Sequence, residues 1–405
     1  MKVLWVNTNF MHPTTKGGQI RTLEMLRHLH RWHEIHYVAI ENPAHPEGPA
    51  RAHEYSSKSY PFTYRIPDKR SPAFWLELIH GLTSPEPVAV ERFHPPGMRK
   101  FLQELIARER FDRAVVDHLA PTSYFPYLDR AVFFQHNVES VIWRRRVEHS
   151  TNPLSRWYNG IQARRMLEYE TRVSRAAGRI VAVSETDAEG MRKLFQVKDV
   201  AVIPTGVNLE YFARPESAQL KTDLVFVGSM DWMPNVDGML WFVREVLPII
   251  RRRRPECSVT IAGRMPSPEI RRLSEQDPAI RVTDTVPDIR PYVWESALSI
   301  VPLRIGGGTR LKIYESMAAG VPVVSTTVGA EGLEVHPPED IRIADTPEAF
   351  AEQCLDLLDN VPTRQNVAQA AHAMVAAQFS WEHVSRRFDE ILQSAPPVTS
   401  LSVPG

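Results

Sequence analysis

The chain has 405 residues, a length that favours two domains and allows sizeable buried cores. Its 48 basic and 48 acidic residues cancel, so bulk charge gives no support for nucleic acid as a partner. Two cysteines, Cys257 and Cys354, are too few for a disulfide framework or a cysteine-based metal cluster. We expect a cytoplasmic protein, because neither a cleavable leader pattern nor a run of about 18 apolar residues is found.

Short apolar runs alternate with helical patterns in the first half of the chain. Val3–Asn7 predicts a strand, a loop containing Gly17 and Gly18 follows, and the pattern IRTLEMLRHLHRW predicts an amphipathic helix before the strand HYVAI. Runs rich in β-branched and aromatic residues are typical of buried parallel strands, and three more occupy residues 113–118, 131–136 and 179–184. Residues 42–96, rich in Pro, His and Tyr, predict loops and short helices.

The alternation restarts after the polar stretch EYFARPESAQL. The strand LVFVGS, a helix at 236–252 and the strands CSVTIAG, RVTDTV, LSIVPL and VPVVST follow. This order predicts an α/β protein made of two doubly wound, Rossmann-like domains with parallel sheets. We place the domains at residues 1–212 and 213–380, then a helix at 381–393 able to pack back on the first domain, and a disordered tail at 394–405.

The most informative segment is LRIGGGTRLKIYESMAAGVPVVSTT, at residues 303–327. After an apolar strand it carries three glycines, Gly306, Gly307 and Gly308. A helical pattern begins at Thr309 and stops at Gly320. Glycines let backbone N–H groups approach an anion, and a helix N-terminus is partially positive. Arg310 and Lys312 stand in the first turn, where cations are unfavourable unless an anion binds. The segment therefore predicts a phosphate site, with a tight turn and solvated cations as the alternative.

The other candidate loops also follow predicted strands. Ligands of open α/β sheets bind outside the carboxyl ends of the strands, so two such domains facing each other would hold a ligand in a cleft between them. The loops at these ends contain Gly17–Gly18, His118, His136, residues 228–235, residues 263–264 and residues 306–312.

Taken in order, these pieces resemble a retaining glycosyltransferase of the GT-B fold, in family 4. The resemblance runs along nearly the whole chain through KGGQIRTLEML, FDRAVVDH, FFQHNVES, IVAVSETD, VIPTGVNLEYF, LVFVGSMDWMPNVDG, VTIAGR and IYESMAAGVPVVSTTVGAEGL. It implies that an acceptor-side N-terminal domain and a nucleotide-sugar-binding C-terminal domain face each other. The implied reaction moves a sugar from a nucleoside-diphosphate sugar to a glycan or lipid-linked glycan, in surface polysaccharide or glycoconjugate biosynthesis, without metal or other cofactor.

The resemblance gives Glu315, in YESMAAG, the task of holding the ribose hydroxyls of the donor, a task that suits a carboxylate. A solvated helix glutamate is the alternative. The first glutamate of the family's signature pair would stand at Gly307, so this chain resembles a subgroup with GGGTRLKI in its place, and the transferred sugar stays unassigned.

Two further departures concern the diphosphate. Ser229 and Asp237 stand near the arginine and lysine that the family often uses to hold it, and neither neutralises phosphate. We therefore predict that Arg310 and Lys312 stabilise the departing diphosphate, with Arg264 as a weaker candidate.

The resemblance implies that His118 approaches the donor sugar; closing a strand end is its alternative role. The candidate catalytic residues are His118, Arg310, Lys312 and Glu315. The candidate donor-binding residues are Gly17, Gly18, Gly228, Arg264, Gly306, Gly307, Gly308 and Thr309, and the candidate acceptor-side residues are His136, Asn137 and Arg21. No carboxylate stands out as a covalent nucleophile, so the resemblance implies a front-side displacement, in which the leaving phosphate helps to deprotonate the acceptor.

Residues 141–175 mix arginines with Trp143, Trp157, Tyr158 and Tyr169. Such a segment either docks on an anionic membrane surface, at the inner face of the membrane, or is a solvated helical face that packs its aromatic rings inward.

Three other functions were weighed. A GT-B relative that epimerises or hydrolyses a nucleotide-sugar would need a carboxylate placed as acid or base, and none is evident. A non-catalytic nucleotide-sugar-binding or partner protein is favoured by the missing glutamate and loop cations. A dinucleotide-dependent oxidoreductase is disfavoured because no G-x-G-x-x-G follows the first strand.

Overall fold

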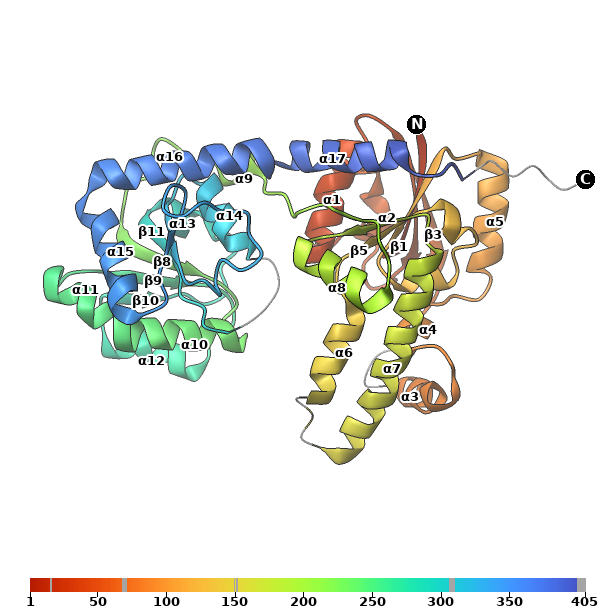
Figure 1. The fold of residues 1–405 in the computed structure, drawn as a ribbon, viewed down its shortest axis with the longest axis horizontal. Helices are drawn as coiled ribbons and strands as arrows, with labels where there is room; N and C mark the ends of the chain where they lie inside the picture. Colours follow the sequence, from red (N-terminus) through yellow and green to blue (C-terminus); the bar gives the residue numbers. More distant parts are fainter. Residues whose placement is uncertain (15–16, 68–70, 149, 151, 306–309, 399–405) are drawn as a thin grey trace, which may run out of the picture. The chain divides into compact units, whose positions relative to one another are not determined.

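The computed structural model describes residues 1–405 except 15–16, 68–70, 149, 151, 306–309 and 399–405 (Figure 1). The chain forms two compact units. Unit 1 comprises Met1–Pro204 and Val384–Gly405, and unit 2 comprises Thr205–His383. The predicted division after residue 212 is therefore too late. Helix α9 (Leu209–Phe212) belongs to unit 2, because Phe212 is buried in the core of that unit.

Unit 1 is built on a parallel sheet. Its strands within the described residues are β1 (Lys2–Asn9), β2 (Glu34–Glu41), β3 (Lys58–Thr63), β4 (Arg113–Asp117), β5 (Val132–Gln135), β6 (Arg179–Ala182) and β7 (Val200–Val202). Their order is β3-β2-β1-β4-β5-β6-β7, with every neighbouring pair parallel. Buried apolar side chains dominate β1, β2, β4, β5 and β6, as expected for strands covered on both faces, whereas the edge strand β3 has no buried residue. The sequence missed β3 and β7.

The helices of unit 1 cover this sheet or extend from it (Figure 1). They are α1 (Gly17–Leu29), α2 (Glu47–Ala50), α3 (Pro72–Thr83), α4 (Val88–Glu91), α5 (Met98–Glu109), α6 (Glu139–Glu148), α7 (Pro153–Ala176) and α8 (Glu185–Phe195). Several begin at side-chain caps: Ser71 accepts from the Phe74 amide, and Ser184 from the Asp187 amide. Within the described part of the chain, no helix has both the length and the apolar character needed to cross a membrane.

The C-terminal helix α17 (Trp381–Ser394) ends in unit 1. The ring of Phe388 lies 5.5 Å from that of Trp5 and 5.2 Å from that of Phe134, between ring centroids. Beyond the helix, Val398 is fully buried, and its amide donates to the Asp112 carbonyl. The expected disorder therefore does not begin at residue 394, because the chain up to residue 398 packs on unit 1.

Unit 2 repeats the architecture. Its described strands are β8 (Thr222–Val227), β9 (Val259–Ala262), β10 (Ile280–Val282), β11 (Ser296–Val301), β12 (Val323–Ser325) and β13 (Arg342–Ile343), in the parallel order β10-β9-β8-β11-β12-β13. The helix expected at 236–252 consists of α10 (Met233–Trp241), a π-helical turn (Phe242–Val246) and α11 (Leu247–Arg253). The other helices are α12 (Pro268–Gln276), α13 (Arg290–Trp294), α14 (Leu311–Ala318), α15 (Pro347–Asp359) and α16 (Val361–Gln378). Cys257 and Cys354 are buried in this core.

Each sheet reverses its winding once. In unit 1 the chain adds β2 and β3 on one side of β1 and then returns to add β4 on the other; in unit 2 it reverses in the same way between β8 and β11. Where the winding reverses, the loops that follow the two neighbouring central strands run to opposite faces of the sheet. This leaves a crevice at the carboxyl ends of those strands. Topology alone thus directs attention to the ends of β1 and β4 in unit 1, and of β8 and β11 in unit 2.

Candidate active site

In unit 1 the reversal point is occupied by a buried carboxylate. Asp117 is the last residue of β4 and is fully buried. Its Oδ2 accepts hydrogen bonds from Trp5 Nε1 (3.0 Å), Asn7 Nδ2 (2.7 Å) and Thr22 Oγ1 (2.9 Å), which come from β1 and α1. Its Oδ1 lies 2.7 Å from Nε2 of His136. Asp117 therefore joins β1, β4, the end of β5 and α1.

The hydrogen bonds of His136 fix its tautomer. Arg21 NH1 lies 3.3 Å from Nδ1 of His136. Because a guanidinium only donates, Nδ1 is the acceptor, and Nε2 carries the proton that is donated to Asp117. Burial, together with the charge of His118, lowers the pKa of His136 to about 3, so the ring is neutral. The pKa of Asp117 is lowered to about 2: burial acts to raise it, but His136, His118 and the donated hydrogen bonds outweigh that effect.

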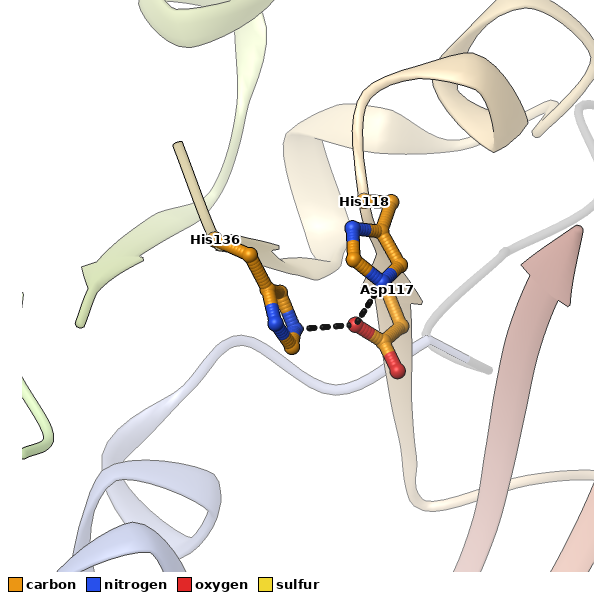
Figure 2. Close-up of side chains that lie close together, drawn as sticks. All are labelled: Asp117, His118 and His136. Carbon is orange, nitrogen blue, oxygen red and sulfur yellow. Dashed lines mark hydrogen bonds and ion pairs between the residues drawn. The ribbon is translucent and has the colours of Figure 1, made fainter. Parts of the chain in front are cut away.

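His118 and His136 point toward the same carboxylate (Figure 2). Their rings stack with centroids 3.9 Å apart, and Nε2 of His118 lies 4.0 Å from Oδ1 of Asp117. His118 adopts a left-handed backbone conformation, with φ of 72°. Non-glycine residues adopt this region at a cost and often at functional sites. His118 keeps about a third of its side chain exposed, so it is the member of this cluster that is accessible to a ligand.

The three residues have the composition of a metal site, since one ligand atom of each lies within 4.8 Å of the others. The hydrogen-bond directions do not fit that role. With Nδ1 of His136 accepting from Arg21 and Nε2 protonated, this ring offers no lone pair to a cation. We therefore interpret the three residues as a polar cluster, in which His136 is hydrogen-bonded to Asp117 and His118 stacks on His136.

The predicted acceptor-side residues separate in the structure. Arg21 and His136 belong to the Asp117 cluster, whereas Asn137 is exposed and hydrogen-bonds to Glu139. Gly18, in the first turn of α1, lies against both rings: a Cβ there would be 3.4 Å from Cε1 of His118 and 3.5 Å from Nδ1 of His136. Gly17 is the first residue of α1.

The outward side of α1 borders a pocket of about 500 Å³ in unit 1. Its lining includes Ile20, Leu23, Glu24, Arg27, His12 and Arg51. Arg27 NH2 and Arg51 Nε each lie 2.5 Å from a carboxylate oxygen of Glu54, which Arg51 and Arg27 hold at a pKa of about 2 against partial burial. The pocket lining thus combines apolar side chains with arginine and glutamate side chains.

In unit 2 the reversal point is occupied by a lysine. Nζ of Lys312, in the first turn of α14, donates to Oδ1 of Asn235 at 3.1 Å, and Nδ2 of Asn235 donates to the Ser229 carbonyl at 2.8 Å. Gly228 lies between them: a Cβ at this position would be 2.7 Å from both Lys312 Nζ and Asn235 Nδ2. A side chain at this position would therefore displace the ends of Lys312 and Asn235.

Burial changes the ionisation of the residues around this lysine. It lowers the pKa of Lys312 to about 7, with the charge of Arg310 acting in the same direction, and it raises the pKa of Glu315 to about 7 against the charge of Lys312. Lys312 and Glu315 stand three residues apart, so they share a face of α14. Neither charge is fully compensated inside the protein, which is the condition expected where a charged ligand binds.

The sequence placed Arg310 in the first turn of the helix. In the structure it immediately precedes α14. It is 5% exposed, its guanidinium carbon lies 5.5 Å from the centre of the Trp232 ring, and burial lowers its pKa against the charge of Glu331. Arg264 is less integrated: 60% of its side chain is exposed, and its Nε donates to Ser229 Oγ at 2.9 Å.

Four predicted donor-binding residues, Gly306, Gly307, Gly308 and Thr309, lie outside the described residues. The structure adds Asp117, Asn7 and Thr22 in unit 1, which the sequence reasoning missed. In unit 2 it selects Asn235 and Trp232 from the candidate loop 228–235. The one sequence signal for Asp117 is that it is a charged residue at the end of the apolar run AVVD. Asp237, which the resemblance places near a lysine position, accepts two hydrogen bonds from Arg304, at 2.6 and 3.1 Å.

Two family models match the chain: Glycosyltransferase Family 4 over residues 15–211, and Glycosyl transferases group 1 over residues 221–360. An uncharacterized 44.6 kDa protein in the cps region of Klebsiella pneumoniae is 25% identical over 169 residues, which are 40% of this chain and 44% of that protein. The GDP-mannose-dependent monoacylated alpha-(1-6)-phosphatidylinositol monomannoside mannosyltransferase of Corynebacterium glutamicum is 32% identical over 90 residues, 22% of this chain and 24% of that enzyme. These matches span less than half of either relative.

Solved structures share the fold at low identity. Sucrose-phosphate synthase from Thermosynechococcus elongatus has a TM-score of 0.66 at 13% identity, covering 97% of this chain and 98% of that one. The Anabaena protein HepE in complex with UDP has a TM-score of 0.64 at 12% identity, covering 97% of this chain and 100% of that one. The predicted α/β fold of two Rossmann-like domains is confirmed, and with the two family matches it shows that this chain belongs to the glycosyltransferases of the GT-B fold, group 1 and family 4.

Proposed function

We propose that the chain is a retaining, metal-independent glycosyltransferase that moves a sugar from a nucleoside-diphosphate sugar to a glycan or lipid-linked glycan acceptor. The reaction would serve surface polysaccharide or glycoconjugate biosynthesis. Two names support this direction: HepE structures contain UDP and UDP-glucose, and the Corynebacterium relative is GDP-mannose-dependent and acts on a phosphatidylinositol mannoside. They differ in base and sugar, so the proposal specifies neither.

The single observation that carries the proposal is that Lys312 lies beside Gly228 at the end of β8, where the charges of Arg310 and Glu315 act on it. In the proposed complex the two cations hold the diphosphate, and the Glu315 carboxylate accepts from the ribose hydroxyls. Diphosphate binding would raise the pKa of Lys312 by supplying the anion that its buried ammonium group lacks. Cations fixed beforehand stabilise the charge that develops on the leaving diphosphate.

We assign the acceptor to unit 1. The pocket beside α1 offers Arg27, Arg51 and Glu24 to hydroxyl groups and Ile20 to the apolar face of a sugar ring. His118, held over His136, is proposed to hydrogen-bond the transferred sugar. Asp117 is saturated by donors and fully buried, so it is a positioning residue and not the nucleophile of a covalent step. A front-side displacement, with the leaving phosphate taking the acceptor proton, is the mechanism that these residues favour.

The second candidate is a non-catalytic nucleotide-sugar-binding or partner protein. The observation that favours it is Asp237, which stands near the position of a diphosphate-binding cation and is occupied instead with Arg304. This candidate retains donor binding but predicts no sugar transfer.

A thermal-shift screen without metal tests the proposal. The full chain is melted with uridine, guanosine, adenosine, thymidine and cytidine diphosphates in EDTA, and again with magnesium. A ligand that binds the native state raises the melting temperature by mass action. We expect one clear stabiliser, equally effective in EDTA, and its loss in Arg310→Ala. No stabiliser at millimolar concentration would overturn donor binding. A stabiliser whose sugar conjugates are never turned over with glycan or lipid-linked acceptors would favour the non-catalytic candidate.

A further inference from the structure

Unit 1 presents large apolar side chains to solvent on two neighbouring helices, well separated in sequence from the Asp117 cluster. On α3, Trp75 is 62%, Leu76 66% and Ile79 61% exposed. On the first turns of α7, Leu154 is 71% and Trp157 56% exposed. We call these five residues the α3–α7 apolar surface. Single exposed apolar residues need no explanation, but five large ones on two helices that are hydrogen-bonded to each other do.

The exposure on α3 is imposed by how the helix is fixed. Ser71 caps it, and its other side packs inward: Leu78 joins a core cluster with Val88, and the Phe74 ring receives the Arg92 guanidinium at 4.9 Å. Its end is tied to α7, because Gln162 Nε2 donates to the Gly81 carbonyl at 2.8 Å and Arg165 NH2 donates to the Leu82 carbonyl at the same distance. Trp75, Leu76 and Ile79 lie on the opposite side of this anchored helix.

The outer part of α7 has no covering of its own. None of residues 152–161, all of them described, is buried. With α6 they form a hairpin that projects from the sheet, and α3 lies beside α7 (Figure 1). The aromatic residues that the sequence grouped together divide here: Trp143 and Tyr169 are buried at 6% and 3%, whereas Trp157 is exposed. Inward packing therefore accounts for Trp143 and Tyr169, but it does not account for Trp157.

The α6–α7 side of this surface is positively charged, whereas Glu77 on α3 is paired with Arg92. Residues 139–176 contain eight arginines and four glutamates. Glu170 is fully buried, where it accepts from the amides of Glu139 and Ser140 at the start of α6, so it does not contribute to the surface. Arg144, Arg145 and Arg156 are exposed. The pairing of Arg144 with Glu148 at 3.9 Å is a surface contact that leaves the cation available.

We propose that the α3–α7 apolar surface docks on an anionic lipid bilayer. Tryptophan and aliphatic side chains enter the interface between headgroups and acyl chains, while neighbouring arginines contact anionic headgroups. A bilayer is the occupant that matches both features, because it accepts a projecting helical hairpin and supplies a continuous negative surface. The docking is independent of the proposed transfer reaction. The residues of α3 were outside the segment that the sequence marked for membrane contact.

Vesicle co-sedimentation of the full chain tests the proposal. Vesicles of phosphatidylcholine alone are compared with vesicles that contain about one third phosphatidylglycerol. One variant carries Trp75→Ser, Leu76→Ser and Ile79→Ser; its control carries Leu220→Ser and Val361→Ser, which are exposed apolar positions of unit 2. A second variant carries Arg144→Ala and Arg145→Ala; its control carries Arg252→Ala and Arg253→Ala, an exposed arginine pair on α11. Circular dichroism and melting temperature verify that each variant is folded.

We expect wild type and both controls to pellet with the anionic vesicles, and both test variants to partition at least about tenfold more weakly. Raised salt should weaken wild-type binding. Three results would overturn the proposal: wild type that stays in solution with anionic vesicles, a folded serine variant that binds as wild type does, or equal binding to neutral vesicles. Size-exclusion chromatography with light scattering adds a fourth: a dimer that the serine variant abolishes, without vesicle binding, would assign the surface to self-association.

Discussion

Nζ of Lys312 lies 3.1 Å from Oδ1 of Asn235, and this contact places an ammonium group directly beside the end of β8. A neutral amide oxygen orients the lysine but does not neutralise it. The residue is therefore positioned in advance for an anion, and its protonation depends on whether that anion is bound.

The contribution of Lys312 to nucleotide binding should disappear as the pH rises. Its pKa is lowered to about 7, so the ligand-free protein loses this charge between about pH 6 and pH 8. We expect the ratio of dissociation constants, Lys312→Met over wild type, to be largest near pH 6, at about tenfold or more. The ratio should fall as the pH rises above 7 and approach one only above the raised pKa that Lys312 has in the complex. Isothermal titration with the stabilising nucleotide measures both constants. Because the nucleotide phosphate titrates equally in both measurements, its effect cancels in the ratio. A ratio independent of pH would contradict the assignment of Lys312 as a diphosphate-binding cation.

Glu315→Gln should affect stability and binding in opposite directions. The pKa of Glu315 is raised to about 7, above its ordinary value of 4.5, so the folded state binds more protons than the unfolded state between these values. Stability is therefore lost as the pH rises from 4.5 to 7. The variant should melt like wild type near pH 5 and higher than wild type at pH 8. Its nucleotide affinity should fall about tenfold or more, because an acceptor of ribose hydroxyls is removed. A lower melting temperature at pH 8 would show that the buried carboxylate has a structural role.

Arg310→Ala should lower turnover by about 100-fold while the unit remains folded, since a fixed cation facing the leaving group contributes several kcal/mol in comparable sites. The measurement is release of nucleoside diphosphate from the donor identified by thermal shift. Arg253→Ala is the matched control, because Arg253 is an exposed arginine of unit 2 paired with Glu352 and Asp359. Equal turnover in Arg310→Ala and in the control would remove Arg310 from the site.

Asp117→Asn should destabilise the protein by about 3 kcal/mol, because the new amide places a donor among four donors and leaves some of them unsatisfied. Urea denaturation at pH 7 measures the change. The direction of the pH dependence is also determined. The pKa of Asp117 is lowered to about 2 from 3.8, so its contribution to the free energy of unfolding is present above pH 3.8 and is lost as the pH falls toward 2. Asn137→Ala, at an exposed position nearby, should change stability little. Equal effects of the two substitutions would contradict this account.

His136 should remain neutral, with its proton on Nε2, from pH 5 to pH 8. Its pKa is lowered to about 3, and Arg21 occupies Nδ1. Long-range proton–nitrogen spectra of the protein labelled with ¹⁵N-histidine report both properties, and the resonance is assigned by its absence in His136→Gln. Titration of this ring near pH 6, or a proton on Nδ1, would overturn the proposed tautomer and reopen the question of a metal ion at this site.

The fold class was predictable because its signals are local. Buried central strands such as β4, β5 and β11 are continuous apolar runs bounded by polar or glycine residues, and that pattern does not depend on what lies elsewhere in the chain. The missed strands β3, β7 and β13 are all sheet edges. β3 contains a proline and β13 has two residues, so each is a strand only because a neighbour pairs with it.

The candidate site was predictable only in part. The sequence marked Arg310, Lys312 and Glu315, since they surround a glycine-rich turn between a strand and a helix, and their roles stay predictions. It did not mark Asp117, because one charged residue at the end of a strand is also an ordinary strand boundary.

Tertiary structure alone gave Asp117 its significance, by bringing Trp5, Asn7 and Thr22 to it across 95 to 112 residues of chain. It also decided that Trp143 packs inward while Trp75 and Trp157 face solvent. The sequence by itself determined which segments form the main helices and the central strands, because hydrophobic periodicity and the bounding glycine and polar residues are encoded within each segment. Which polar groups meet, and which apolar faces stay uncovered, depends on packing between distant segments, and only the folded chain specifies it.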